Sequence, residues 1–258
     1  MTTLEEAIQQ HGRPLLGFSI QGCNNPVFVE MTAALGLQVL WIEMEHQPIT
    51  FPQAADLCRI ASGLGLLVMI RIPDARRENV LRAAECGPDI IDLPMANSPE
   101  IVAELVTHAK YPPIGSRGYF STSRALRYGM SGDIPAEQAR INRELCLMGQ
   151  IETREAADRM DEICAVPGLD AIFIGPGDLS SSLGIIDQRR NPLLLQTMDR
   201  IIAAAKRHGK LVALPGSPAD ARLWAEKGVD LFFIGSDTSC LSLGAKTFAE
   251  QARAALGR

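Results

Sequence analysis

LVMIRIP at residues 67–73, DIIDLPM at residues 89–95, AIFIGP at residues 171–176 and LFFIGSD at residues 231–237 are short, almost continuously apolar runs. Such runs are typical of strands that are buried on both faces, as in a parallel sheet. Segments with apolar residues at helical spacing separate them. Eight strands that alternate with helices predict a (β/α)8 barrel, which is an α/β fold. The other four expected strands cover residues 15–20, 39–45, 145–152 and 210–215.

The helical pattern and the length of the chain support the same fold. The 258 residues suit one barrel domain, because barrels of this kind typically run to about 250 residues. A last helix, over residues 238–256, has room to pack on its own barrel or on that of a neighbour. The clearest other helices are expected over residues 50–64, 99–109, 135–144, 154–165 and 192–208.

Composition excludes several classes of protein. The net charge of −5 leaves no basic surface for nucleic acid, and it argues against binding to an anionic membrane. The first residues, MTTLEEAIQQHGRP, lack the features of a signal peptide, and no apolar run approaches the roughly 20 residues that span a bilayer. Six cysteines without a CxxC pair indicate reduced, buried thiols. We therefore expect a cytoplasmic enzyme that acts on small molecules.

Polar residues follow the strands, where the carboxyl ends of a barrel carry its active site. Glu152 in QIETRE and Asp178 in IGPGDLS stand at or just past two neighbouring strand ends. Two such carboxylates can hold a hard divalent cation and leave its other positions to water and substrate. The alternative is that they cap the helices that follow, as an N-terminal Asp often does.

A second group of candidates follows the second and third strands. Glu43, Glu45 and His46 end WIEMEHQP, and a histidine beside carboxylates can act as a general base. Arg71 in MIRIPD must find an anionic partner, either a substrate carboxylate or enolate, or an internal glutamate such as Glu45 or Glu85. Gln150 alternates with Glu152 and should point the same way.

One connection, residues 111–133, is unusually long, and loops of that kind often bind ligands. Its Arg117 and Arg124 are candidates to reach the mouth of the barrel. Other chemistry finds less support. No GxxxxGK[ST] or strand-linked GxGxxG indicates a nucleotide, and no GxSxG is present. No lysine stands at a clear strand end, which disfavours a Schiff-base aldolase.

The motifs together resemble those of the HpcH/HpaI family of metal-dependent pyruvate aldolases. They are WIEMEHQP, VMIRIPD, YPPIGSRG, QIETREA and IFIGPGDLS, and the resemblance runs from about residue 17 to residue 237. The combination of YPP-x-G-x-RG and GP-x-DLS is specific. The segment STSRALRYG is more similar to the 2-dehydro-3-deoxyglucarate aldolase branch than to the 4-hydroxy-2-oxoheptanedioate aldolase branch.

The resemblance implies a role for each candidate. Glu152 and Asp178 would hold Mg2+, Mn2+ or Co2+, and Gln150 and Arg71 would contact the 2-oxo acid. His46 would be the base, supported by Glu45 or Glu43. The family also implies a hexamer, a trimer of dimers that exchange the C-terminal helix. The substrate pocket would be lined by Pro176, Gly177, Pro215 and Gly216, with Arg124 as a further contact.

The expected reaction is the reversible cleavage of a 4-hydroxy-2-oxo acid into pyruvate and an aldehyde. The chain departs from the family at Glu43 and Glu85, where Asp is usual. Each change adds one methylene, which shifts the hydrogen bonds around His46 by up to about 1 Å. The alternatives are a related enolate-forming lyase, such as a decarboxylase or CoA-ester lyase, and a non-catalytic barrel that binds a 2-oxo acid.

Overall fold

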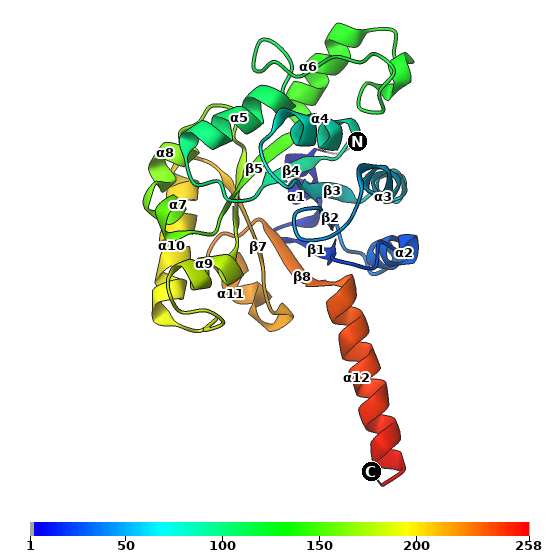
Figure 1. The fold of residues 1–258 in the computed structure, drawn as a ribbon, viewed down its shortest axis with the longest axis vertical. Coiled ribbons are helices and arrows are strands. Elements are labelled where there is room, and N and C mark those ends of the chain that lie inside the picture. Colours follow the sequence, from blue (N-terminus) through cyan, green and yellow to red (C-terminus); the bar gives the residue numbers. More distant parts are fainter. Residues whose placement is uncertain (1–2, 258) are drawn as a thin grey trace.

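Eight parallel strands form a closed barrel in this computed structural model, which describes residues 3–257. Each strand pairs with the next along the chain, and the last pairs with the first (Figure 1). The predicted (β/α)8 fold is therefore confirmed. The strands are β1 (Leu15–Ile20), β2 (Val39–Glu43), β3 (Leu67–Arg71), β4 (Ile90–Leu93), β5 (Cys146–Ile151), β6 (Ala171–Ile174), β7 (Leu211–Pro215) and β8 (Leu231–Ser236).

Helices surround the barrel and bury its outer face. The segment expected as one helix over residues 154–165 is divided in two at Arg159, whose ψ of 18° interrupts the first helix. No described helix is long and apolar enough to cross a membrane. The helices are α1 (Leu4–His11), α2 (Pro26–Ala34), α3 (Phe51–Gly63), α4 (Arg77–Glu85), α5 (Pro99–Ala109), α6 (Ile134–Glu144), α7 (Arg154–Asp158), α8 (Met160–Cys164), α9 (Pro176–Ser182), α10 (Pro192–Arg207), α11 (Ala221–Glu226) and α12 (Asp237–Ala255), with short 3-10 turns at Arg127–Gly129 and Pro218–Asp220.

The helices begin where short polar side chains can cap them. Thr153 accepts a hydrogen bond from the backbone N–H of Ala156, and Asn191 accepts one from Leu193. Pro192 then opens α10, where its missing N–H is not needed. Thr153 ends the loop after β5 two residues beyond the strand, so the end of β5 stays close to the mouth of the barrel.

The barrel interior is packed with side chains. Trp41, Phe173 and Phe233 meet at its centre, with ring centroids 5.2–6.0 Å apart. At the N-terminal end of the strands, Leu4 and Ile8 of α1 join the same buried cluster and close the barrel. Alternate residues of a strand point inward. The inward positions beyond the aromatic layer therefore face the open, carboxyl-terminal end.

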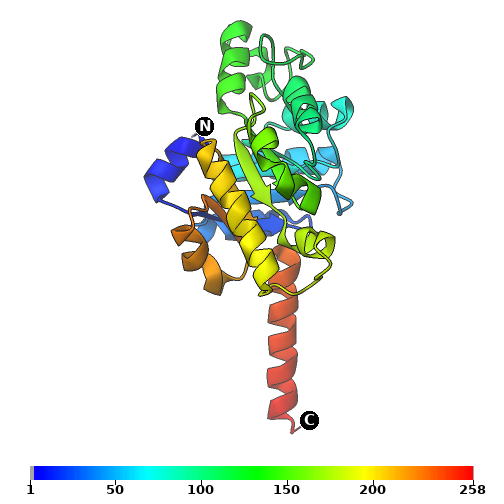
Figure 2. The same ribbon diagram turned by 90° about the vertical axis from the view of Figure 1, so that its left-hand side faces the viewer.

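The long connection lies away from that end. Because α5 runs back toward the starts of the strands, residues 111–133 and α6 gather near the start of β5, where Lys110 Nζ contacts the carbonyl oxygen of Leu145. Figures 1 and 2 show α6 and α12 at opposite ends of the long axis of the molecule. In its own chain the connection is therefore not a lid over the mouth.

Gly115 provides a test of how this connection is anchored. A Cβ at Gly115 would lie 2.5 Å from the carbonyl oxygen of Lys110 and 2.8 Å from that of Thr107. We expect Gly115→Ala to lower the free energy of unfolding by about 1–3 kcal/mol, as overpacking does. Gly63→Ala is the control, because no atom lies within 4 Å of the Cβ it adds at the end of α3. Equal denaturant midpoints for the two variants would contradict this account.

Candidate functional site

The mouth of the barrel is built from inward-facing residues one layer above the aromatic core. Glu43 follows Trp41 on β2, Arg71 follows Met69 on β3, and Gln150 lies two residues after Met148 on β5. The side-chain period of two in a strand brings all of them to the same end of the barrel. Polar residues predicted from three separate strands are thus brought together.

Arg71 lies at the centre of this layer and is almost fully buried. Its Nε and Nη2 atoms are each 2.5 Å from Glu43 Oε2, and its Nη1 is 3.1 Å from Glu45 Oε2. The guanidinium carbon also lies 5.1 Å from the centre of the Trp41 ring. Two carboxylates and an aromatic face therefore hold the guanidinium in one orientation. Of the internal partners considered from sequence, Arg71 meets Glu45 and not Glu85.

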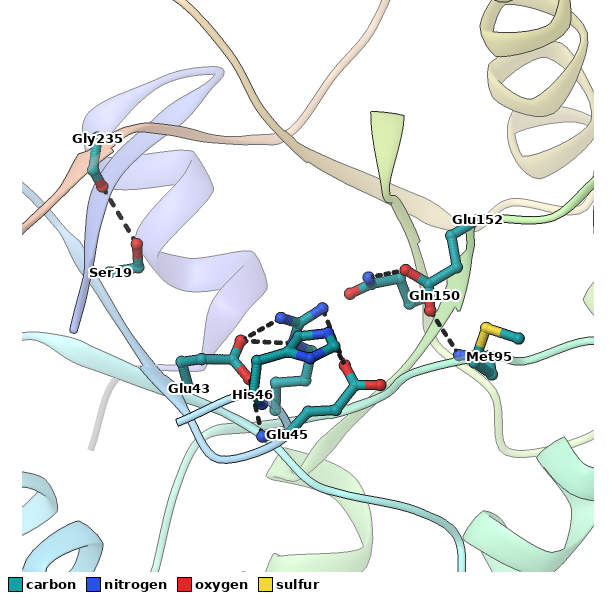
Figure 3. A network of polar contacts seen from close by, with 9 residues as sticks. Ser19, Glu43, Glu45, His46, Met95, Gln150, Glu152 and Gly235 are labelled. Carbon is teal, nitrogen blue, oxygen red and sulfur yellow. Dashed lines mark hydrogen bonds and ion pairs between the residues drawn. The ribbon is translucent and has the colours of Figure 1, made fainter. Parts of the chain in front are cut away.

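Glu43 also shapes the turn that carries His46. Its Oε1 accepts hydrogen bonds from the backbone N–H groups of Glu45, at 2.8 Å, and His46, at 3.0 Å. The imidazole is 61% exposed, and its Nε2 is 3.3 Å from Glu45 Oε2 (Figure 3). Burial raises the pKa of Glu45, while the charge of Arg71 opposes that rise. His46 thus stands at the open side of the mouth with a carboxylate behind it.

Glu152 is held on the facing side, beyond the end of β5. Its Oε1 accepts the backbone N–H of Met95 at 2.8 Å, and its Oε2 accepts a hydrogen bond from Gln150 Nε2 (Figure 3). Burial raises the pKa of Glu152, and repulsion from Asp178 adds to the rise. Gly175 leaves the necessary space, since a Cβ there would lie 2.8 Å from Glu152 Oε2.

Neither acidic candidate serves as a helix cap. Thr153 caps α7 in place of Glu152, and Asp178 lies in the first turn of α9 without a hydrogen bond to any described side chain or backbone group. Asp178 is exposed, and Gln150 Oε1 is buried without a hydrogen-bond partner in residues 3–257. Free oxygen atoms at this point fit a hard divalent cation. Among the described residues there is no group of three or more metal-binding side chains. Glu152 and Asp178 are a pair of carboxylates and would not count as such a group.

The sequence matches proteins of known activity. The model of the HpcH/HpaI aldolase/citrate lyase family matches residues 20–243. The chain belongs to this family. It is 32% identical to a hydroxypyruvate/pyruvate aldolase of Deinococcus radiodurans, over 92% of this chain and 85% of that protein. It is 34% identical to a 2-keto-3-deoxy-L-rhamnonate aldolase of Klebsiella pneumoniae, over 81% and 78%.

A solved structure of a related protein has the same fold. The HpcH/HpaI aldolase from Desulfitobacterium hafniense superposes with a TM-score of 0.91, at 28% identity, and the match covers 98% of this chain and 97% of that one. The family match and the aldolase relatives establish a carbon–carbon lyase of the aldolase type. Because the relatives carry different substrate names, they leave the branch suggested by STSRALRYG as a prediction.

Two candidates of this HpcH/HpaI aldolase lie outside the cluster. Glu85 ends α4, at the closed end of the barrel, where it pairs with Arg117 at 2.9 Å. Arg124 is on the long connection, and its Nη2 is 3.4 Å from the carbonyl oxygen of Cys58. Within one chain neither residue meets Arg71 or Glu152. Their catalytic and substrate roles stay predictions.

The predicted pocket residues divide between two walls of the aldolase mouth. Pro176 and Gly177 begin α9 beside Asp178. Pro215 and Gly216, at the end of β7, line a cavity of about 230 Å³ together with Trp41. The larger cavities, of about 380 and 430 Å³, are lined by residues of α1 and the strand starts, at the closed end of the barrel.

Asp92 is a residue that the sequence analysis overlooked. It points into the barrel from β4, in register with Arg71, and it is fully buried. Neither of its carboxyl oxygens has a hydrogen-bond partner in the described part of the chain. Burial raises its pKa well above the usual range, although Arg71 opposes the rise. The sequence does hold a signal, because DIIDLPM places an ionisable residue inside an apolar strand.

The raised pKa of Asp92 predicts how stability depends on pH. Between the pKa of the unfolded chain, about 3.9, and the higher folded value, the native state binds the extra proton, so stability falls as pH rises. Asp92→Asn should therefore raise the unfolding temperature at pH 8 by a few degrees, since 1 kcal/mol corresponds to roughly 2–4 °C here. The gain should vanish near pH 4.

Thermal unfolding in metal-free buffer at pH 4, 6 and 8 measures this difference. Asp158→Asn is the matched control, because its carboxylate is 58% exposed and, within residues 3–257, pairs only with Arg200 at the surface. A gain for Asp92→Asn that is equal at pH 4 and pH 8, or a loss at pH 8, would show that the pKa of Asp92 is not raised in the native protein.

Proposed function

We propose that the enzyme catalyses the reversible, divalent-metal-dependent aldol cleavage of a 4-hydroxy-2-oxo acid into pyruvate and an aldehyde. The observation that carries the proposal is the convergence of Glu152, Gln150 and Arg71 in one buried layer. The aldolase relatives support the reaction, because one of them is a hydroxypyruvate/pyruvate aldolase.

Glu152 and Asp178 would hold the cation, with Mg2+, Mn2+ and Co2+ as candidates. When bound, the cation supplies a Lewis acid that polarises the ketone and stabilises the negative charge of the enolate. The remaining work falls to the protein side chains. Gln150 donates a hydrogen bond from its amide nitrogen to Glu152 and thereby fixes that carboxylate. The Gln150 side chain would also lie beside the 2-oxo acid.

Arg71 would stabilise the charge that develops on the oxygen of the 2-oxo group. Because Glu43 and Glu45 already orient the guanidinium, little rearrangement is required when the charge appears. The side chain of Glu43 is one methylene longer than that of Asp, and it reaches both Arg71 and the backbone N–H of Glu45. The hydrogen-bond network is therefore complete although Asp is usual at this position.

His46 would move the proton of the 4-hydroxyl group. As the C3–C4 bond breaks, the electron pair of that bond passes to the enolate, and the hydroxyl proton passes to the imidazole of His46, leaving an aldehyde. The protonated imidazole is stabilised by Glu45, 3.3 Å away. Solvent water then protonates the enolate at C3 to yield pyruvate, and His46 returns its proton to solvent. The exposed position of His46 keeps it accessible to the part of the substrate nearest the solvent.

Removal of one proposed ligand tests this mechanism. Glu152→Gln keeps the size of the side chain, but loses the charge that binds the cation. Lewis-acid stabilisation is worth several kcal/mol, so pyruvate release should fall on the order of a thousand-fold. Chelator should have a similar effect on the wild type. Release of pyruvate from 4-hydroxy-2-oxo acids, with added Mn2+ or Mg2+, is the measurement.

Glu155→Gln, on the exposed face of α7 three residues away, should retain activity. Both variants should unfold at temperatures close to that of the wild type. Full turnover by Glu152→Gln, or turnover that resists chelator, would exclude the metal-dependent reaction.

We also propose a hexamer, a trimer of dimers, in which α12 packs on a neighbouring barrel. The helix has one buried residue, Asp237, while Leu241, Leu243 and Phe248 are 60–73% exposed. Figure 2 shows α12 extending away from its own barrel. Exposed apolar side chains on a projecting helix are typical of an interface. A neighbour could also supply the mouth with Glu85 and Arg124.

A change of charge on α12 tests this assembly. Phe248→Glu should reduce the hexamer to smaller species, because it would bury an unpaired carboxylate in the interface. Lys246→Gln, on the same helix and 74% exposed at its side chain, is the control and should leave the assembly intact. Light scattering coupled to size-exclusion chromatography gives the mass. A monomeric wild type, or a hexameric Phe248→Glu variant, would contradict the proposal.

A further inference from the structure

The loop between β4 and α5 reaches the end of β5 through a turn of unusual backbone geometry. Met95 has a φ of 50°, in the left-handed region that residues other than glycine rarely adopt. Its side chain is 44% exposed, so burial of the side chain does not explain this conformation. Backbone strain of this kind persists where surrounding contacts hold it, and it is common at functional sites.

Two backbone hydrogen-bond donors join residues 95–97 to the end of β5. The Met95 N–H donates to Glu152 Oε1 at 2.8 Å, as Figure 3 shows. The Ala96 N–H donates to the carbonyl oxygen of Gln150 at 3.0 Å and so extends the pairing of β4 with β5. Both contacts use groups that every residue except proline carries, so they depend on the path of the loop and not on its side chains.

Asn97 supplies a third link, which does depend on a side chain. Its Oδ1 accepts a hydrogen bond from the hydroxyl of Thr153 at 2.7 Å. Its own N–H donates to the carbonyl oxygen of Met95, also at 2.7 Å. Asn97 is thus bonded both to the residue that follows Glu152 and to the residue whose N–H holds Glu152. A displacement of Asn97 therefore moves the Met95 turn relative to the carboxylate.

Thr153 is a fixed point for this link, because its hydroxyl group is used both as donor and as acceptor. The oxygen accepts a backbone N–H and caps α7, while the hydrogen is donated to Asn97. The next residue, Arg154, donates its N–H to Ser182 Oγ at 3.0 Å, at the end of α9. The first turn of α9 carries Asp178. The start of α7 therefore aligns the loop of Asn97 with the helix of the second proposed ligand.

The effect of these links falls on the orientation of the Glu152 carboxylate. Each of its oxygens accepts one hydrogen bond, Oε1 from Met95 and Oε2 from Gln150, and each retains a second lone pair. The carboxylate is buried, so it cannot rotate without losing one of these bonds. A ligand that is already oriented loses less freedom when a cation binds, and its hydrogen-bond partners therefore contribute to metal affinity.

We propose that Asn97 is a positioning residue for the proposed metal ligand Glu152. Its hydrogen bond with Thr153 holds the strained Met95 turn against the end of β5, and the Met95 N–H then fixes the carboxylate for the cation. Asn97 acts through these two residues and not as a ligand. This inference rests on the proposed metal-dependent function and deepens the same site.

Removal of the side-chain oxygen of Asn97 tests this role. Asn97→Leu keeps the approximate size of the side chain and loses the acceptor, whereas Asn97→Asp retains an acceptor for the Thr153 hydroxyl. Loss of a group that orients a metal ligand typically lowers affinity, so Asn97→Leu should raise the Kd for Mn2+ by about 10- to 100-fold. Asn97→Asp should bind Mn2+ with an affinity close to that of the wild type. The electron paramagnetic resonance signal of free Mn2+ gives Kd without substrate or turnover.

Thr153→Val breaks the same hydrogen bond from the other side, and it provides the test if Asn97→Leu does not fold. It should also raise the Kd for Mn2+. In a variant that carries both changes the two effects should not add, because both changes remove one bond. Thr153→Ser keeps the hydroxyl group and should bind Mn2+ as the wild type does.

Ser98→Ala is the matched control, because Ser98 lies in the same loop and its hydroxyl caps α5 instead. It should lower the unfolding temperature in metal-free buffer and leave the Kd for Mn2+ unchanged. A folded Asn97→Leu variant that binds Mn2+ as tightly as the wild type, or equal losses in Asn97→Leu and Asn97→Asp, would overturn the role of Asn97 alone. A wild type that binds none of Mn2+, Mg2+ and Co2+ would overturn the proposed function and this inference with it.

Discussion

The ion pair between Arg71 and Glu43 is the interaction on which the rest of the mouth depends. The two residues are register partners on β2 and β3, and both are buried. Breaking a buried pair leaves an uncompensated charge and typically costs about 3–5 kcal/mol. The same Glu43 holds the backbone of Glu45 and His46, so the pair sets the position of the proposed base as well as that of the guanidinium.

The electrostatics of the mouth follow from placing several carboxyl groups around one arginine. Burial raises the pKa of Asp92, Glu45 and Glu152, and their mutual repulsion adds to the effect. Asp92, which is the most deeply buried, can accept a proton without loss of a hydrogen bond to the protein. A divalent cation beside Glu152 and Asp178 would offset the remaining negative charge. The carboxyl groups of this layer together, and not one of them alone, therefore require positive charge nearby.

The barrel separates two tasks within one opening. Strands β2 to β6 carry the ionised cluster and are suited to the keto-acid end of a substrate. Strands β7, β8 and β1 carry small residues, such as Gly216 and Gly235, and so leave a cavity beside the loop that bears Arg189. Trp41 forms the floor that the two share. Loop residues at this end of the barrel can therefore change without disturbing the Arg71–Glu43 pair.

The eight strands, the closed barrel, the family and the inward set of Glu43, Arg71, Gln150 and Glu152 could be predicted from the sequence, because burial on both faces and a side-chain period of two are local properties. The sequence analysis missed the raised pKa of Asp92 and the cavity that Arg189 lines. Both depend on which strands and loops become neighbours when the sheet closes. It also placed Arg124 near the mouth, whereas the direction of α5 carries the long connection to the other end. These points follow from the folded arrangement, since the distance between charges depends on packing and not on spacing along the chain.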